Sequence, residues 1–163
     1  MYTNRVCQKL HDEHMATLVL LERLEHLVAN NNPPATADAG TRALLVDLAV
    51  AFESEVWCHF DFEEEHLFEY FSQSGDTEMA QHLITEHQQI KSVAEPIIAM
   101  ARAAAKSGFQ PAVWNEFRPL SRQLVEQLTA HVHKEEGVLV PLLQDSMENE
   151  TEEQLYGVYV MGG

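Results

Sequence analysis

The sequence predicts an all-α protein, an up-down-up-down four-helix bundle with a short acidic C-terminal extension. Apolar residues recur at three- and four-residue spacing through four long stretches, which is the period of an amphipathic helix. Short connectors rich in Asn, Pro, Gly and Ser separate these stretches, as expected for helices that pack antiparallel to their neighbours. Alternating runs of β-branched residues bounded by turns, which would indicate strands, are missing.

The first helix is expected over residues 3–29, because Leu10 and Leu18 belong to an apolar stripe with helical spacing. The segment NNNPPATADAG that follows has the composition of a loop. The second helix is expected over residues 41–71 and carries Tyr70 on its inner face. The turn sequence SQSGDT then ends this helix.

The third helix is expected over residues 77–105, with Asp76 or the following threonine as its N-cap. The fourth is expected over residues 111–144 and opens with a proline, which suits the first turn of a helix. Its inner face should include Val138 and Leu142, so that it copies the second helix almost position for position.

One domain is expected for residues 1–145, because a chain of this length with 45% hydrophobic residues can bury a single core. Residues 146–163 form a tail that is first acidic and then mildly apolar. This tail is expected either to form a short helix on the bundle or to fray.

The charge balance disfavours partners that are themselves anionic. Ten Lys and Arg residues stand against 26 Asp and Glu residues, for a net charge of −16, which repels nucleic acid and anionic membrane surfaces. No apolar run is long enough to span a bilayer, and the polar N-terminal stretch does not resemble a secretory signal. Cys7 and Cys58 make no disulfide framework. A cytoplasmic protein that binds neither nucleic acid nor membrane is expected.

A His-x3-Glu motif occurs twice, in HFDFEEEHL from His59 and in HVHKEEGVL from His131. Positions i and i+4 lie on one face of a helix, so each histidine and its motif glutamate, Glu63 or Glu135, point the same way. Both pairs interrupt an apolar stripe. Burying an ionisable carboxylate there is costly unless a charge or a metal compensates it.

Two lone histidines complete an internal repeat. His14 lies on the apolar stripe of the first helix and His87 near that of the third, whereas His11 lies at the edge of its stripe. Nearly the same spacing separates His14 from His59 and His87 from His131. Each half of the chain therefore contributes one lone histidine and one His–Glu pair.

Taken singly, each of these histidines is best interpreted as a satisfied core residue; the whole set favours a metal site. The predicted ligands are His14, His59, Glu63, His87, His131 and Glu135. Imidazoles and carboxylates suit iron, manganese or zinc, and the absence of thiolate ligands argues against an iron–sulfur cluster. Two carboxylates between two histidine pairs suit a dinuclear centre in which each glutamate bridges both ions. One zinc ion would need only four of the six ligands. Iron is preferred, and manganese and zinc stay open.

Several neighbours are candidates for supporting roles. Glu55, one turn before His59, and Glu86, beside His87, can orient ligand imidazoles or line a path for protons or iron, or else be surface acids. His66 can substitute for a ligand, although a place behind the ligands or on the helix surface suits it better. Glu64 and Glu136 repeat in both motifs but are expected to be solvated.

The order His, HxxxE, His, HxxxE, with EExxL after each pair, resembles the hemerythrin-like HHE cation-binding family over about residues 10–144. This resemblance implies two iron ions in a non-haem centre with a solvent-derived bridge, able to bind or reduce dioxygen or nitric oxide. It also implies that the four histidines are terminal ligands and that Glu63 and Glu135 are bridges.

The pattern differs from that of the oxygen-carrying hemerythrins, which have two histidines a turn apart on the third helix and end in HxxxxD. Here Leu83 and Lys91 flank His87 at four residues, and the last motif ends in Glu135. The chain is more similar to the branch with HxxxE twice, which includes domains of iron–sulfur cluster repair proteins and of iron-sensing ubiquitin-ligase subunits. It lacks the short cysteine-bearing N-terminal domain usual in the repair proteins.

The expected function is binding of a small diatomic ligand, dioxygen or nitric oxide, for storage, sensing or stress defence. Two alternatives remain open: an oxidoreductase that turns over peroxide or nitric oxide, and an iron-donating or iron-centre repair protein. A redox partner and a homodimer are compatible with each.

Overall fold

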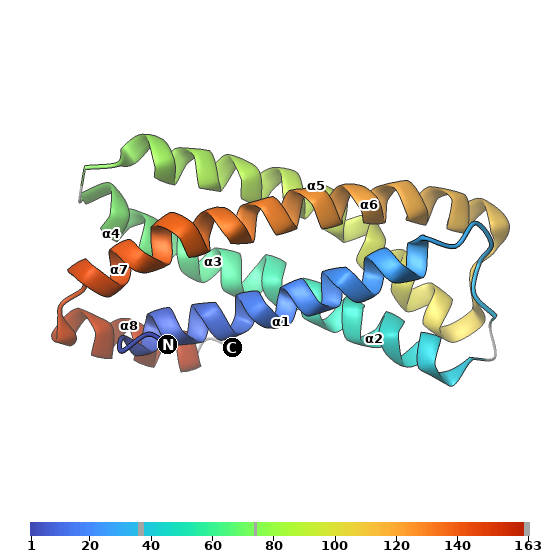
Figure 1. The fold of residues 1–163 in the computed structure, drawn as a ribbon, viewed down its shortest axis with the longest axis horizontal. Helices are drawn as coiled ribbons and strands as arrows, with labels where there is room; N and C mark the ends of the chain where they lie inside the picture. The colour runs from blue at the N-terminus through green and yellow to red at the C-terminus, as the bar shows by residue number, and fades with distance from the viewer. Residues whose placement is uncertain (36–37, 74, 162–163) are drawn as a thin grey trace.

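The computed structural model describes residues 1–35, 38–73 and 75–161, and every regular element in these ranges is helical (Figure 1). The all-α prediction is therefore confirmed. The α-helices and π-helical turns (η), in chain order, are α1 (Arg5–Val28), α2 (Ala39–Ser54), η1 (Glu55–His59), α3 (Phe60–Phe62), η2 (Glu63–Leu67), α4 (Phe68–Gln73), α5 (Thr77–Ser107), α6 (Pro111–Lys134), η3 (Glu135–Leu139), α7 (Val140–Ser146) and α8 (Asn149–Met161).

Side chains at the helix starts satisfy backbone N–H groups that have no partner within the helix. The side chain of Asn4 accepts from the backbone N–H of Cys7 at 3.0 Å, and Asp76 accepts from that of Met79 at 3.1 Å. Asp76 is thus the N-cap that the sequence predicts. Gly108, at φ 76°, ends α5 in a backbone conformation that favours glycine.

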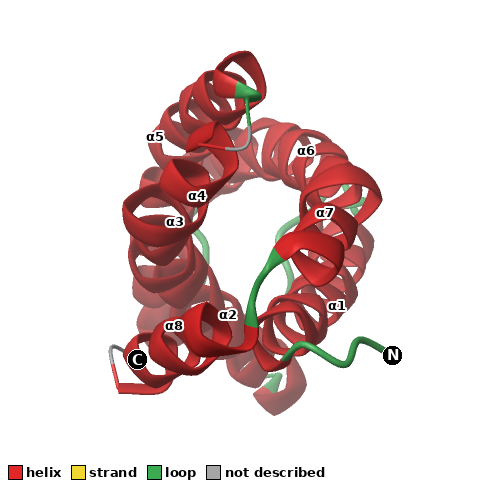
Figure 2. Cartoon of the chain, turned by 90° about the vertical axis from the view of Figure 1, so that its left-hand side faces the viewer, coloured by secondary structure: helices red, strands yellow, loops and turns green. Residues whose placement is uncertain are grey.

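The long helices run side by side along the molecule (Figure 1). Helix α1 packs against α6 and α7, α2 packs against α5, and α5 packs against α6. Viewed along the long axis, these segments surround a common interior, and α8 lies at one side (Figure 2). Helix α8 returns along α1. The part of the tail that the structure describes thus includes a helix, one of the two expected outcomes.

Two apolar clusters fill the interior. One contains Leu21, Phe52, Ile90 and Leu128, and the other contains residues nearer α7 and α8, such as Leu143. In α1 and α5, a short polar stretch that carries His14 or His87 separates the residues of the first cluster from those of the second. In the other two long segments, the histidines and glutamates that the sequence singles out lie among apolar residues where the two clusters meet.

The π turns change which residues face inward. In η3 the backbone N–H of Val140 bonds to the carbonyl of Glu135, five residues earlier, so this turn holds one residue more than an α turn. The inner face consequently advances by one position: Val138 is 43% exposed and Leu142 36%, whereas Leu139 and Leu143 are buried.

The same shift follows η2. There the backbone N–H of Phe68 bonds to the carbonyl of Glu63, and Phe71 is buried where Tyr70 was expected. The predictions for Val138, Leu142 and Tyr70 assumed an unbroken α period and are corrected here.

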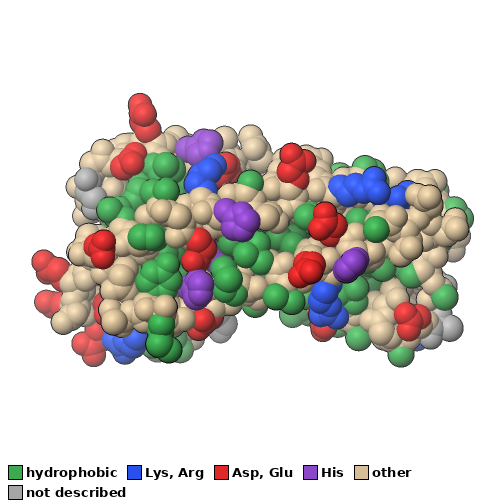
Figure 3. All heavy atoms as spheres, in the orientation of Figure 1, with side chains coloured by type: hydrophobic (Ala, Val, Ile, Leu, Met, Phe, Trp, Pro, Cys, Tyr) green, Lys and Arg blue, Asp and Glu red, His purple; other side chains and the backbone are tan. Residues whose placement is uncertain are grey.

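Acidic side chains are scattered over the face seen in Figure 3, among apolar and a few basic groups, rather than gathered in one patch. Most Asp and Glu residues in the described ranges are exposed, so most of the surplus carboxylates are solvated. In the described ranges, no helix combines the length and the apolar composition that crossing a bilayer requires.

Candidate metal centre

The six predicted ligands come together in the interior, and each is at most 3% exposed. His14 comes from α1, His59 ends η1, and Glu63 begins η2. His87 comes from α5, His131 from α6, and Glu135 begins η3. They form two groups whose potential ligand atoms lie within 4.8 Å of one another: His14, His59, Glu63 and Glu135, and Glu63, His87, His131 and Glu135.

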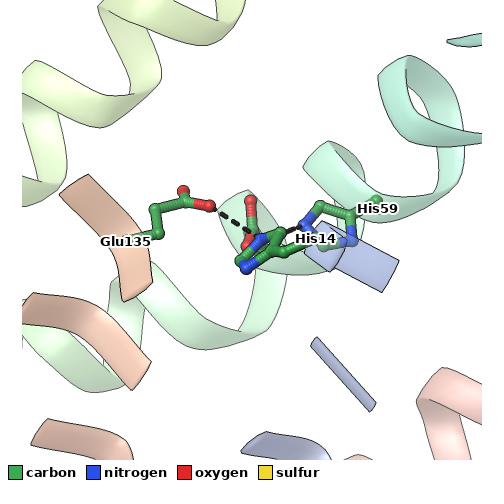
Figure 4. Close-up of side chains that lie close together, drawn as sticks. His14, His59 and Glu135 are labelled. Carbon is green, nitrogen blue, oxygen red and sulfur yellow. Dashed lines mark hydrogen bonds and ion pairs between the residues drawn. The ribbon is translucent and has the colours of Figure 1, made fainter. Parts of the chain in front are cut away.

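The two histidines of each group point their Nε2 atoms at each other. The Nε2 atoms of His14 and His59 are 3.1 Å apart, and those of His87 and His131 are 2.9 Å apart. Glu135 reaches His14 from a helix on the other side of the site (Figure 4). Each pair of imidazole nitrogens can therefore face one metal ion.

Each central carboxylate directs one oxygen to each histidine pair. Oε1 of Glu63 is 3.1 Å from Nε2 of His59, and its Oε2 is 3.3 Å from Nε2 of His87. Oε2 of Glu135 is 3.1 Å from Nε2 of His14, and its Oε1 is 3.0 Å from Nε2 of His131. This is the arrangement that two bridging carboxylates between two metal positions would need.

The carboxylate oxygens of Glu63 and Glu135 are better placed to bind a cation than to accept hydrogen bonds from the protein. Despite the short distances, none of the four oxygens of Glu63 and Glu135 accepts a well-directed hydrogen bond. Buried carboxylates without hydrogen bonds are costly, because desolvation of the charge is not offset. Oxygen and imidazole nitrogen ligands at this spacing suit iron, manganese or zinc.

A second layer of carboxylates holds the outer nitrogen of every candidate ligand histidine. Nδ1 of His14 lies 2.6 Å from Glu136, that of His59 2.9 Å from Glu13, that of His87 2.8 Å from Glu64 and that of His131 2.8 Å from Glu86. A carboxylate at Nδ1 fixes the proton there, so Nε2 keeps its lone pair for a metal. The four pairs thus prepare all four histidines as ligands.

These pairs correct one prediction. Glu64 and Glu136 were expected to be solvated, but each reaches across to the lone histidine of the other half. Glu86, one of the candidates for a supporting role, contacts Nδ1 of His131. Glu13 was not predicted, although the sequence held a signal: both lone histidines directly follow a glutamate, Glu13 before His14 and Glu86 before His87.

The remaining candidates lie outside the two groups. Nδ1 of His11 lies 2.8 Å from Glu136, and the nearest carboxylate oxygen to His66 is 3.9 Å away, on Glu65. Glu55 contacts none of the imidazole Nδ1 atoms. It is 5% exposed and accepts a hydrogen bond from Thr17 through Oε2, while its Oε1 has no partner.

Burial and neighbouring charges shift the pKa values of the histidines and of their carboxylate partners. Burial lowers the pKa of His131 and of His14, but the carboxylates around them outweigh this and raise the values to about 10 and about 9. Burial raises the pKa of Glu13, yet hydrogen bonds from His59, Lys9 and Tyr159 lower it to about 2. The hydrogen bond from His131 also lowers the pKa of Glu86 to about 2.

A cavity of about 570 Å³ lies beside the centre, on the side of His59. Its wall combines apolar side chains of α1, α2 and α3 with the carboxylates of Glu13 and Glu55, and α8 contributes Tyr159. On the opposite side, the ring of Phe60 stacks on that of His87 at 3.7 Å. A small molecule therefore has room to approach the His14–His59 group.

The chain is thus an all-helical protein with two buried groups of histidines and shared glutamates that could hold a metal cation. Among family models, the one described as "Hemerythrin HHE cation binding domain" matches residues 6–143. The chain therefore belongs to the hemerythrin HHE cation-binding family, as its motifs indicated. The match includes all six central residues and ends before α8. No individual curated protein matches the chain.

Proposed function

We propose that the protein holds two iron ions in a non-haem dinuclear centre and binds dioxygen or a related diatomic such as nitric oxide. One observation carries the proposal: Glu63 and Glu135 belong to both groups of candidate ligands and direct one oxygen to each. The ligands would be His14 and His59 at one ion, His87 and His131 at the other, and the two glutamates as bridges. Four long helical segments in up-down-up-down order would enclose this centre.

When bound, the two iron ions would supply the redox chemistry that diatomic ligand binding needs. The chain itself supplies an apolar surround, fixed imidazole orientations and an approach through the cavity beside His59. Four imidazoles and two carboxylates leave coordination positions free for an exogenous ligand.

Metal analysis together with absorption spectroscopy tests this function. After anaerobic loading with Fe²⁺ and exposure to air, the protein should hold about two iron ions per chain and absorb in the near ultraviolet as oxo-bridged iron does. Parallel loading with Mn²⁺ and Zn²⁺ compares the metals. Fewer than one iron per chain, with no such absorption, would refute the proposal.

The buried carboxylate of Glu55, whose Oε1 atom has no hydrogen-bond partner, favours a second candidate, an oxidoreductase acting on peroxide or nitric oxide at the same centre. Burial raises the pKa of Glu55, so this side chain can carry a proton close to His59. Turnover of peroxide by the iron-loaded protein with a reductant would support this candidate, provided that Glu55→Gln slows turnover and leaves the iron content unchanged. Binding without turnover would leave the carrier function.

A further inference from the structure

Helix α8 brings a tyrosine to the candidate centre from outside the segment that matches the family. Tyr159 is the buried residue of α8, at 7% exposure. Its ring stacks on Phe62 of α3, with centroids 3.9 Å apart and an interplanar angle of 7°. The ammonium group of Lys9, from α1, lies 4.4 Å from the ring centroid. Tyr159 thus spans α1 and α3 at the wall of the cavity.

The hydroxyl of Tyr159 contacts both members of one imidazole–carboxylate pair. It donates a hydrogen bond to Oε2 of Glu13, the same oxygen that accepts from Nδ1 of His59. The phenol oxygen also lies 3.1 Å from that Nδ1 atom. A movement of Tyr159 would therefore change the position of His59, both through their direct contact and through Glu13.

The other half of the centre has a different group at the corresponding place. Glu86, which accepts from His131, is held by the ammonium group of Lys134, one turn along the same helix as His131. The internal repeat thus extends through the six central residues and their carboxylate partners but ends there. Beyond that layer the two halves differ: Lys9 of α1 and Tyr159 of α8 hold Glu13, whereas His82 of α5 and Lys134 of α6 hold Glu86.

We propose that Tyr159 is a positioning residue for the His14–His59 metal position and makes the two metal positions unequal. It holds Glu13 against His59 and covers the gap between α1 and α3 beside the cavity. The inference rests on the proposed function, because it requires both positions to bind metal. Metal at the His14–His59 position is retained through α8, and metal at the His87–His131 position is retained through Lys134.

The variant Tyr159→Phe isolates the hydroxyl, because the ring that packs on Phe62 is kept. Loss of a partner that orients a metal-binding histidine weakens metal binding by about 10- to 100-fold. Glu13 retains Lys9 and His59 as donors, so we expect the lower end of this range. One of the two ions should leave about ten times faster.

Chelator capture after anaerobic Fe²⁺ loading tests the inference on the full chain. Tyr159→Phe should speed the release of one iron equivalent, Lys134→Met should speed that of the other, and the double variant should speed both. Tyr156→Phe is the matched control on the same helix, because Tyr156 packs under Arg5 with 4.7 Å between the guanidinium carbon and the ring centroid. Release unchanged by Tyr159→Phe, or speeding of the same equivalent by Tyr159→Phe and Lys134→Met, would overturn the proposal.

A spectroscopic measurement separates positioning from general loosening. In the Co²⁺-loaded protein, the ligand imidazole N–H protons should give hyperfine-shifted, exchangeable NMR signals. Tyr159→Phe should move one of them, and Tyr156→Phe none. Faster release with no moved signal, or with all signals moved, would overturn the positioning role. The metal content of the unmodified protein is measured first. Fewer than two ions per chain would contradict the proposed function. Two ions per chain, with iron release and NMR signals that Tyr159→Phe leaves unchanged, would contradict this inference alone.

Discussion

Replacing His59 and Glu63 together by leucine should stabilise the metal-free protein and remove its stabilisation by metal. The two side chains are 3% and 0% exposed, and they form one i, i+4 pair. Neither oxygen of Glu63 accepts a well-directed hydrogen bond. The pair therefore costs desolvation in the metal-free fold, and a bound cation would offset that cost.

The expected changes have opposite signs and can be sized. Replacing a buried ion pair by apolar residues of similar volume commonly stabilises by about 1–4 kcal/mol. For a chain of this size, each kcal/mol raises the Tm by about 2–4 °C. With free metal at about 100 times its Kd, each bound ion stabilises the unmodified protein by about 2.7 kcal/mol, a gain that the variant should lack.

Thermal unfolding with and without metal measures both the stability of the metal-free variant and its stabilisation by metal. Glu22→Ala with His26→Ala is the control, because this i, i+4 pair is exposed on α1. The control should change the free energy of unfolding by no more than about 0.5 kcal/mol and keep the full metal-induced shift. A metal-free His59→Leu/Glu63→Leu protein that is less stable than the unmodified one would refute the reasoning. So would a metal-induced rise in its Tm equal to that of the unmodified protein.

Three further predictions concern protons and the second layer. Loading with metal at pH 7 should release at least two protons per chain, since His14 and His131 have pKa values of about 9 and about 10; calorimetry in buffers of different ionisation enthalpy counts them. Both pKa values are raised, so the protonated histidines stabilise the metal-free fold fully below about pH 6.5. That contribution is lost as pH rises through 9 and 10, and urea midpoints should fall over this interval while metal affinity rises. Glu64→Gln and Glu136→Gln should each weaken metal binding by about 10- to 100-fold in chelator competition, whereas Glu148→Gln on the surface should have no effect.

Local periodicity was sufficient to bring the six central residues together from the sequence. His59 and Glu63 lie one turn apart on a stripe that is otherwise apolar, as do His131 and Glu135, and a polar group on such a stripe must face the interior. The exact repeat of the pairs then indicated that the two would meet. Helix boundaries followed equally from local chemistry, for example from Asp76 as an N-cap.

What the sequence did not predict depends on how neighbouring helices fit together. Glu64 and Glu136 lie at the edge of the inner face of their helical segments, with side chains 28% and 15% exposed. A projection of one helix therefore cannot tell whether such a side chain faces solvent or contacts a histidine of a neighbouring helix. Tyr159 reaches His59 only because α8 folds back along α1. The extra residue of η2 and that of η3 left no recognisable mark in the composition, so Tyr70, Val138 and Leu142 were placed on the inner face one position early.

The crossing of carboxylates between the halves has a consequence for assembly. Glu64, in the first half, holds His87 in the second, and Glu136, in the second half, holds His14 in the first. Neither half of the chain contains all six candidate ligands, and the lone histidine of each half is held by a glutamate of the other half. If the two halves were made as separate fragments, each alone should bind metal weakly, and metal should bind tightly only where it joins the two. The intact chain thus resembles a metal-dependent dimer whose two subunits are covalently linked.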